Sequence, residues 1–145
     1  MIPTFTNKGF LPPGIHWSTI DEIKKILCFS DKRIKLLQGF ELAISSLKKA
    51  GCETVYIDGS FASEKTEPGD IDVCWELKNV DLGLLMSIEP VFFNPFDGRK
   101  EQKAKFGCEF FFSDWVAASP PDILFLDFFQ EDRNGNKKGI IGLKL

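Results

Sequence analysis

The chain has 145 residues, of which 43% are apolar and 27% charged, and these values are ordinary for a globular protein. This length fits a single domain, residues 1–145, that buries about two-thirds of its unfolded surface. A net charge of −3 argues against bulk attraction to nucleic acid, so no DNA partner is expected, while a local basic patch for RNA stays compatible with it.

The N-terminal segment is predicted to be an arm followed by a short helix. Residues 1–17 are interpreted as irregular, because Pro12-Pro13-Gly14 is incompatible with regular helix. Thr19 and Glu22 then fit a capping box, in which each side chain satisfies a free N–H group at the helix start. The helix that they begin is expected to end near Cys28.

A longer helix is predicted next, capped by Ser30 and followed by Gly51, a residue type that favours the position after a helix end. Its apolar residues recur at roughly helical spacing, namely Ile34, Leu36, Leu37, Phe40, Leu42, Ile44 and Leu47. After it, residues 53–58 have the apolar composition of a strand.

The remaining segments alternate between predicted strands, turns and helices. Strands are expected at 70–77, 108–113 and 139–145, helical segments at 81–86 and 122–130, and loops at 90–105 and 114–121. This order predicts an α+β fold, in which a small mixed sheet is flanked by helices and the strands near 53–58, 70–77 and 108–113 are adjacent.

A Gly-Ser turn and an Asp-x-Asp pair frame the most informative segment. Gly59-Ser60 follows the apolar strand Val55-Tyr56-Ile57, and Asp70 and Asp72 begin the next strand. Side chains alternate along a strand, so both carboxylates project from one face, about 7 Å apart. Such a pair suits Mg²⁺ ions, which in-line phosphoryl or nucleotidyl transfer requires. The alternative is a solvated strand edge, since Asp-x-Asp also occurs by chance.

Ile57-Asp58-Gly59-Ser60 together with Gly69-Asp70-Ile71-Asp72-Val73 resembles the active-site motif of the DNA polymerase beta-like nucleotidyltransferase superfamily. The closest resemblance is to its minimal single-domain members from bacterial toxin–antitoxin and phage-defence operons. The motif covers residues 55–77, and the order of elements extends the likeness to residues 31–113. The Leu-Pro-Pro-Gly-Ile-His arm and the ending Phe-Phe-Gln … Lys-Gly-Ile also resemble small bacterial proteins of unassigned function in this superfamily.

The resemblance implies a division of labour among these residues. Gly59 and Ser60 would hold the terminal phosphates of a nucleoside triphosphate, and Asp70 and Asp72 would bind Mg²⁺. The superfamily adds a third carboxylate on a neighbouring strand. The candidate is Glu109, because it lies in an apolar run where a charge is costly unless it is paired or bound to metal.

Other readings of the third carboxylate stay open. Glu109 is alternatively a charged residue on a half-exposed strand face. Asp114 and Asp127 are weaker candidates, the first as a loop residue or helix cap and the second within a helical apolar run.

Two departures from the superfamily pattern favour a degenerate, noncatalytic protein. Minimal members often place a basic residue just after Gly-Ser, where this chain has Phe61-Ala62-Ser63-Glu64. Lys65 is the candidate substitute, with a solvated loop lysine as the alternative. The third acid, if it is Glu109, is Glu where Asp is usual.

Basic and isolated polar residues complete the candidate site. Arg99, Lys100, Lys103 and Lys105 cluster before the third strand, where they would neutralise triphosphate or contact RNA phosphates, or simply form a solvated helix face. His16 is the only histidine and is expected to pack or hydrogen-bond in the arm. Asp58 is interpreted as a plain strand end.

Absent features narrow the setting. The four cysteines form no Cys-x-x-Cys pair, which argues against zinc and favours buried thiols in a reducing cytosol. No signal peptide and no run of 18 apolar residues is present, so a cytoplasmic protein without a membrane span is expected.

Two functional hypotheses follow from these features. The first is a Mg²⁺-dependent nucleotidyltransferase that acts on a protein side chain or an RNA end. The second is a binding module that keeps the fold and masks a partner, as an antitoxin would. Phe-rich segments favour a protein partner or self-association.

Overall fold

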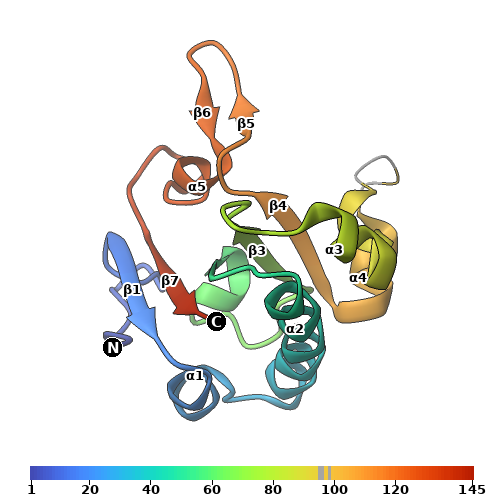
Figure 1. Ribbon diagram of the computed structural model, residues 1–145. Coiled ribbons are helices and arrows are strands. Elements are labelled where there is room, and N and C mark those ends of the chain that lie inside the picture. The colour runs from blue at the N-terminus through green and yellow to red at the C-terminus, as the bar shows by residue number, and fades with distance from the viewer. Residues whose placement is uncertain (95–96, 98) are drawn as a thin grey trace.

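Five strands form one mixed sheet at the centre of the molecule, whose computed structural model describes residues 1–94, 97 and 99–145 (Figure 1). Their spatial order is β1 (Gly14–Ser18), β7 (Gly139–Lys144), β2 (Thr54–Asp58), β3 (Ile71–Trp75) and β4 (Cys108–Phe112). Strand β2 is antiparallel to both of its neighbours, while β1 is parallel to β7 and β4 is parallel to β3. The predicted α+β fold is confirmed, and the three strands expected to be adjacent are β2, β3 and β4.

The helices begin and end for local reasons that the sequence carries. Helix α1 (Ile20–Leu27) starts at Thr19, whose hydroxyl accepts a hydrogen bond from the Glu22 N–H. Helix α2 (Asp31–Lys49) starts at Ser30, whose hydroxyl accepts from the Arg33 N–H. Gly51 follows α2 with φ of +98°, a conformation that glycine adopts without steric cost.

Shorter elements connect the strands. Helix α3 (Leu82–Ile88) and the 3₁₀ helix η2 (Pro90–Phe93) follow β3, and α4 (Lys100–Phe106) precedes β4. The 3₁₀ helix η1 (Gly59–Ala62) follows β2 directly. A separate hairpin of β5 (Val116–Ala118) and β6 (Ile123–Leu124) leads into α5 (Phe125–Phe128).

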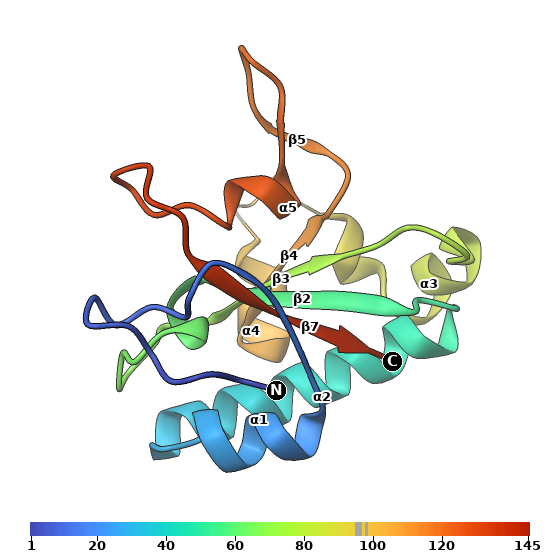
Figure 2. The same ribbon diagram turned by 90° about the vertical axis from the view of Figure 1, so that its left-hand side faces the viewer.

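The two faces of the sheet are covered differently. Figure 2 shows α1 and α2 on one side of the sheet and α5 on the other. The side facing α1 and α2 carries the main core, with the strand residues Val55, Ile57, Ile71, Val73, Trp75, Ile141 and Leu143. The opposite side has a smaller cluster of Tyr56, Cys74 and Ile140, against which Phe111 and residues of the α5 segment pack. Polar strand residues therefore find space on this second face.

Several sequence-based expectations need correction. Residues 14–17 are not irregular but belong to β1, because pairing with β7 (Ile15 with Ile140) outweighs the local Pro-Gly signal. The expected loop 114–121 contains β5, and the helix expected at 122–130 is reduced to α5, because Val116 pairs with Leu124 in the hairpin. Ile34 and Leu42 are exposed, at 45% and 67%, although they were assigned to the apolar face of α2.

The segment 90–105 is more ordered than a loop, since it contains η2 and α4; residues 95, 96 and 98 lie outside the described part of the chain. Within the described residues, no helix is both long enough and apolar enough to cross a membrane.

Candidate active site

Three carboxylates meet on the second face of the sheet. Asp70 directly precedes β3, Asp72 lies within it, and Glu109 is the residue of β4 paired with Asp72. Alternation along β3 and the parallel register with β4 place all three on one face. One oxygen from each lies within 4.8 Å of the others, and all three residues are half-buried. The structure thus brings together the three acids that the sequence singled out.

Mutual repulsion and partial burial raise the proton affinity of this cluster. Burial, followed by the charges of Asp70 and Glu109, raises the pKa of Asp72 to about 7. Burial and the Asp70 charge also raise the pKa of Glu109. Nearby basic side chains offset these effects only in part, Lys138 and Lys103 at Asp72 and Lys103 and Arg99 at Glu109, and a bound cation would favour the charged forms further.

A fourth carboxylate, Asp58, lies next to the cluster, on the neighbouring strand β2. It is wholly buried at the end of β2 and paired with Asp72 in the register. Its Oδ2 accepts a weak hydrogen bond from the Cys74 thiol at 3.5 Å, and its Oδ1 has no hydrogen-bond partner among the described residues. Burial and the facing Asp72 raise the pKa of Asp58 well above its usual value. Asp58 is therefore more than a plain strand end, and strand alternation with Tyr56 was the signal for its facing direction.

The Gly-Ser turn is packed against the acids. Gly59 begins η1 with φ of +68°, and a Cβ at this position would lie 2.1 Å from the Asp72 Oδ2. Only glycine therefore allows the backbone to approach Asp72 this closely.

Basic side chains lie around the cluster. Lys103 of α4 forms an ion pair with Asp70, at 3.2 Å between Nζ and Oδ2. Arg99 donates from Nε to the Phe110 carbonyl at 2.9 Å, and its guanidinium lies 4.0 Å from the centre of the Phe111 ring. Lys138, which the sequence reading did not single out, is close enough for its charge to lower the pKa values of Asp58 and Asp72.

The other basic and acidic candidates lie elsewhere. Lys105 pairs with Glu89 at 2.7 Å, and the side chain of Lys100 is exposed. Asp114 and Asp127 are exposed and do not belong to the three-carboxylate group. The Lys65 side chain is exposed as well. His16 Nε2–H donates to the Pro12 carbonyl at 2.6 Å, so His16 makes the expected hydrogen bond within the N-terminal segment, although it lies in β1.

A buried arginine is the residue that sequence reasoning missed. Arg33 is wholly buried, and its guanidinium donates to backbone carbonyls of the Ser60–Lys65 segment. Its position three, four and seven residues before Leu36, Leu37 and Phe40 places it on the apolar face of α2, and this spacing was the available signal.

A family model matches residues 3–144, which is nearly the whole chain. The chain belongs to the family of unknown function DUF6932. Comparisons with curated proteins and with solved structures gave no match. The family assignment therefore gives kinship without a stated activity, and the chemistry must be argued from the site.

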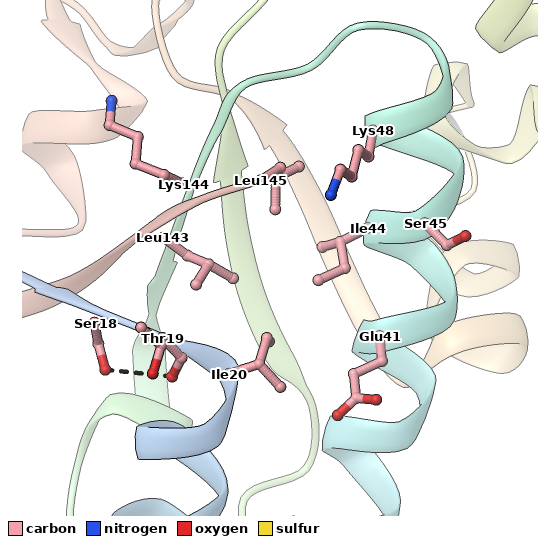
Figure 3. A pocket seen from close by; sticks show the side chains of 10 residues that line it. All are labelled: Ser18, Thr19, Ile20, Glu41, Ile44, Ser45, Lys48, Leu143, Lys144 and Leu145. Atoms are coloured by element: carbon pink, nitrogen blue, oxygen red, sulfur yellow. Dashed lines mark hydrogen bonds between the residues drawn. The ribbon is translucent and has the colours of Figure 1, made fainter.

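A pocket of about 510 Å³ lies apart from the acids, at the junction of α1, α2 and the end of β7. Figure 3 shows Ile20, Ile44, Leu143 and Leu145 pointing into the space between α2 and β7. None of the clustered carboxylates lines this pocket. The acid cluster is therefore not part of this hollow.

Gly59→Ala is expected to weaken Mg²⁺ binding at least tenfold and to cost about 1–3 kcal/mol of unfolding free energy. The new Cβ would overlap Asp72 Oδ2, so that carboxylate would rotate away from Asp70 and Glu109. Calorimetric Mg²⁺ titration and urea unfolding measure the two effects.

Gly135→Ala is the matched control, because Gly135 also has a positive φ, +80°, but nothing lies within 4 Å of a Cβ there. It should carry the backbone strain alone and leave Mg²⁺ affinity unchanged. Equal Mg²⁺ affinities of the two variants would contradict the assigned contact between Gly59 and Asp72.

Proposed function

We propose that this protein is a Mg²⁺-dependent nucleotidyltransferase that moves a nucleotidyl group from a nucleoside triphosphate to a macromolecular acceptor. The observation that carries the proposal is the convergence of Asp70, Asp72 and Glu109 from two adjacent strands, beside the Gly59-Ser60 turn. An isolated Asp-x-Asp pair would supply two carboxylates from one strand, whereas here a third carboxylate, from the neighbouring strand, joins them.

The residues fit a magnesium ion by the chemistry of their donors. Mg²⁺ prefers oxygen ligands and is usually bound through one or two carboxylates and substrate phosphates. Asp70, Asp72 and Glu109 would hold it, and the raised pKa values of Asp72 and Glu109 mark negative charge that a cation would relieve. When bound, the metal supplies charge neutralisation and alignment for in-line displacement at a phosphate.

The chain's own groups then bind and orient the triphosphate. Gly59 and Ser60 are assigned to the terminal phosphates by their resemblance to the nucleotidyltransferase motif. We assign the neutralisation of phosphate charge to Arg99, Lys103 and Lys138, whose charges act on the clustered carboxylates. This positioning and neutralisation is how phosphoryl-type transfers are mainly accelerated.

The acceptor is proposed to be a protein side chain or an RNA end, in a toxin–antitoxin or phage-defence setting. Helix α5 lies on the side of the sheet that carries the acids, and its Phe128 is 46% exposed. Trp115, directly before β5, is 55% exposed. Large exposed apolar side chains support contact with a macromolecule. Self-association through the same surface is an alternative use of it.

The second candidate is a degenerate module that retains the fold and acts by binding a protein. The Lys103–Asp70 ion pair favours it, because a lysine already neutralises part of the cluster. The absence of a basic residue directly after Gly59-Ser60 favours it too.

The Asp70→Asn, Asp72→Asn double variant is expected to stay folded and to lose Mg²⁺-dependent nucleotide binding by at least a hundredfold. Wild type and variant are incubated with α-labelled nucleoside triphosphates, Mg²⁺, total RNA and the purified operon neighbour. Label should transfer to RNA or protein with wild type only. An unchanged affinity in the double variant would show that the assigned site is wrong.

The same experiment separates the two candidates. Nucleotide binding or transfer that requires both aspartates supports the enzyme. A stable complex with the neighbour, together with no nucleotide binding by wild type, supports the degenerate module. Rapid transfer to a small-molecule acceptor would contradict the proposed macromolecular acceptor but not the proposed nucleotidyltransferase activity.

A further inference from the structure

The most unusual charge in the molecule is the guanidinium of Arg33. It is wholly buried in the first turn of α2, whereas arginine is rarely buried to this extent without an acidic partner. The ion pairs of the described residues do not include it. Burial lowers its pKa to about 10, so it still carries its charge at neutral pH.

Backbone carbonyls provide the compensation instead. Nε donates to the Lys65 carbonyl at 2.9 Å, and Nη1 donates to the carbonyls of Leu27 and Phe61 at 3.1 and 2.9 Å. Nη2 contacts the carbonyls of Ser60, Ser63 and Lys65 at 3.3, 2.5 and 2.7 Å. Every nitrogen of the guanidinium is therefore used, and four of the five residues that accept belong to the segment from Ser60 to Lys65.

This arrangement fixes the course of the segment that follows the Gly-Ser turn. The segment wraps around the guanidinium, and the Ser63 hydroxyl adds a hydrogen bond to the Ser60 carbonyl at 2.6 Å. A trans peptide directs its N–H opposite to its C=O, so the N–H groups that follow the accepting carbonyls face away from Arg33, namely those of Phe61, Ala62, Glu64 and Thr66. The Glu64 N–H donates to the Gly9 carbonyl at 3.0 Å, which also ties the segment to the N-terminal arm. The aromatic rings of Phe29 and Phe61 lie 4.2 and 4.9 Å from the guanidinium and hold it in place.

We propose that Arg33 is a positioning residue that shapes residues 59–65 into a phosphate-binding loop and holds this loop beside Asp72. The inference rests on the proposed function, and it assigns the preorganisation of the loop to one buried side chain on another element. Lysine is no substitute, because its single ammonium has three donors and cannot span these carbonyls.

Arg33→Lys tests the proposal, with Leu47→Ala as control because Leu47 is also wholly buried in α2, near its other end. Amide hydrogen exchange is measured for residues 60–66 relative to β3, and calorimetry gives affinities for Mg²⁺ and for a nucleoside triphosphate with Mg²⁺. In Arg33→Lys, relative loop exchange should rise at least tenfold and nucleotide affinity should fall at least tenfold. Mg²⁺ affinity without nucleotide should stay within twofold, because the carboxylates are untouched.

Phe29→Ala keeps the test decisive if Arg33→Lys does not fold. Phe29 is 48% exposed, so its removal loosens the guanidinium with little loss of core. About threefold faster relative loop exchange and threefold weaker nucleotide binding are expected.

The outcomes distinguish this inference from the proposed function. If wild type binds nucleotide but the variants behave like Leu47→Ala, the role of Arg33 is overturned and the proposed function stands. If wild type binds no nucleotide, the proposed nucleotidyltransferase function and the role of Arg33 in phosphate binding are both overturned.

Discussion

Asp72→Asn should be more stable than wild type by about 2–4 kcal/mol at pH 8 without divalent cations. The pKa of Asp72 is raised from 3.8 to about 7, so its ionised form is penalised in the folded state. Replacing it with a neutral amide removes both the burial cost and the repulsion from Asp70 and Glu109. A residue whose removal stabilises the fold is a mark of a site built for a ligand rather than for stability.

The sign of the pH dependence follows from the same shift. Between about pH 4 and pH 7 the folded state binds more protons at Asp72 than the unfolded state does. The penalty that Asp72 imposes on the unfolding free energy of wild type therefore decreases as the pH falls. The advantage of Asp72→Asn should therefore be full above about pH 7 and vanish near pH 4. Urea unfolding at several pH values measures the difference between variant and wild type.

Asp127→Asn is the control, because Asp127 is an exposed carboxylate outside the cluster. Addition of Mg²⁺ at pH 8 should stabilise wild type and not Asp72→Asn. The difference in unfolding free energy between the two proteins should therefore shrink or change sign. Parallel pH profiles for wild type and Asp72→Asn would contradict the assigned electrostatics.

Gly39→Ala should destabilise the protein by about 3 kcal/mol or more. Gly39 lies in α2, and a Cβ there would lie 2.0 Å from the Phe106 carbonyl oxygen and 2.8 Å from its carbon. Both atoms are backbone, so no rotamer change relieves the overlap. The gain in helix propensity, about 1 kcal/mol, is too small to offset the displacement of α4.

Gly83→Ala is the matched control in α3, since the nearest atom to its Cβ would be the Asp81 Oδ1 at 3.5 Å. It should stabilise slightly, by about 0.5–1 kcal/mol. Phe106 is followed closely by β4, so Gly39→Ala should also shift Glu109 and weaken Mg²⁺ binding. Equal urea midpoints for the two alanine variants would show that α2 and α4 are not packed this tightly.

Local signals predicted much of this fold because they have short-range causes. The caps at Thr19 and Ser30 need only their own side chains and the next turn, and the sheet strands β2, β3, β4 and β7 consist mostly of apolar residues. Strand β1 escaped prediction because its pairing partner lies more than 120 residues away, in β7. The hairpin of β5 and β6 was missed because its strands have only three and two residues and the Ser-Pro-Pro-Asp sequence between them is typical of a loop.

The candidate site was predictable where residue type and alternation were enough. Asp70, Asp72 and Glu109 follow from strand register, once the strands are assumed to be neighbours. Lys138 and Arg33 act across the fold, one near the start of β7 and the other from α2, so only tertiary structure reveals them. Asp58 was interpreted as a plain strand end because the sequence does not show what covers the second face of the sheet and buries this residue.

The place of β7 has a consequence for how the molecule is made on the ribosome. The strand formed by residues 139–144 lies between β1 and β2, so β1 has no partner in the sheet until residues 139–144 are synthesised. Before that, the nascent chain exposes β2 as an unpaired edge, which favours association with other chains. Translation that stalls before residue 139 should therefore yield aggregation-prone fragments that need a chaperone.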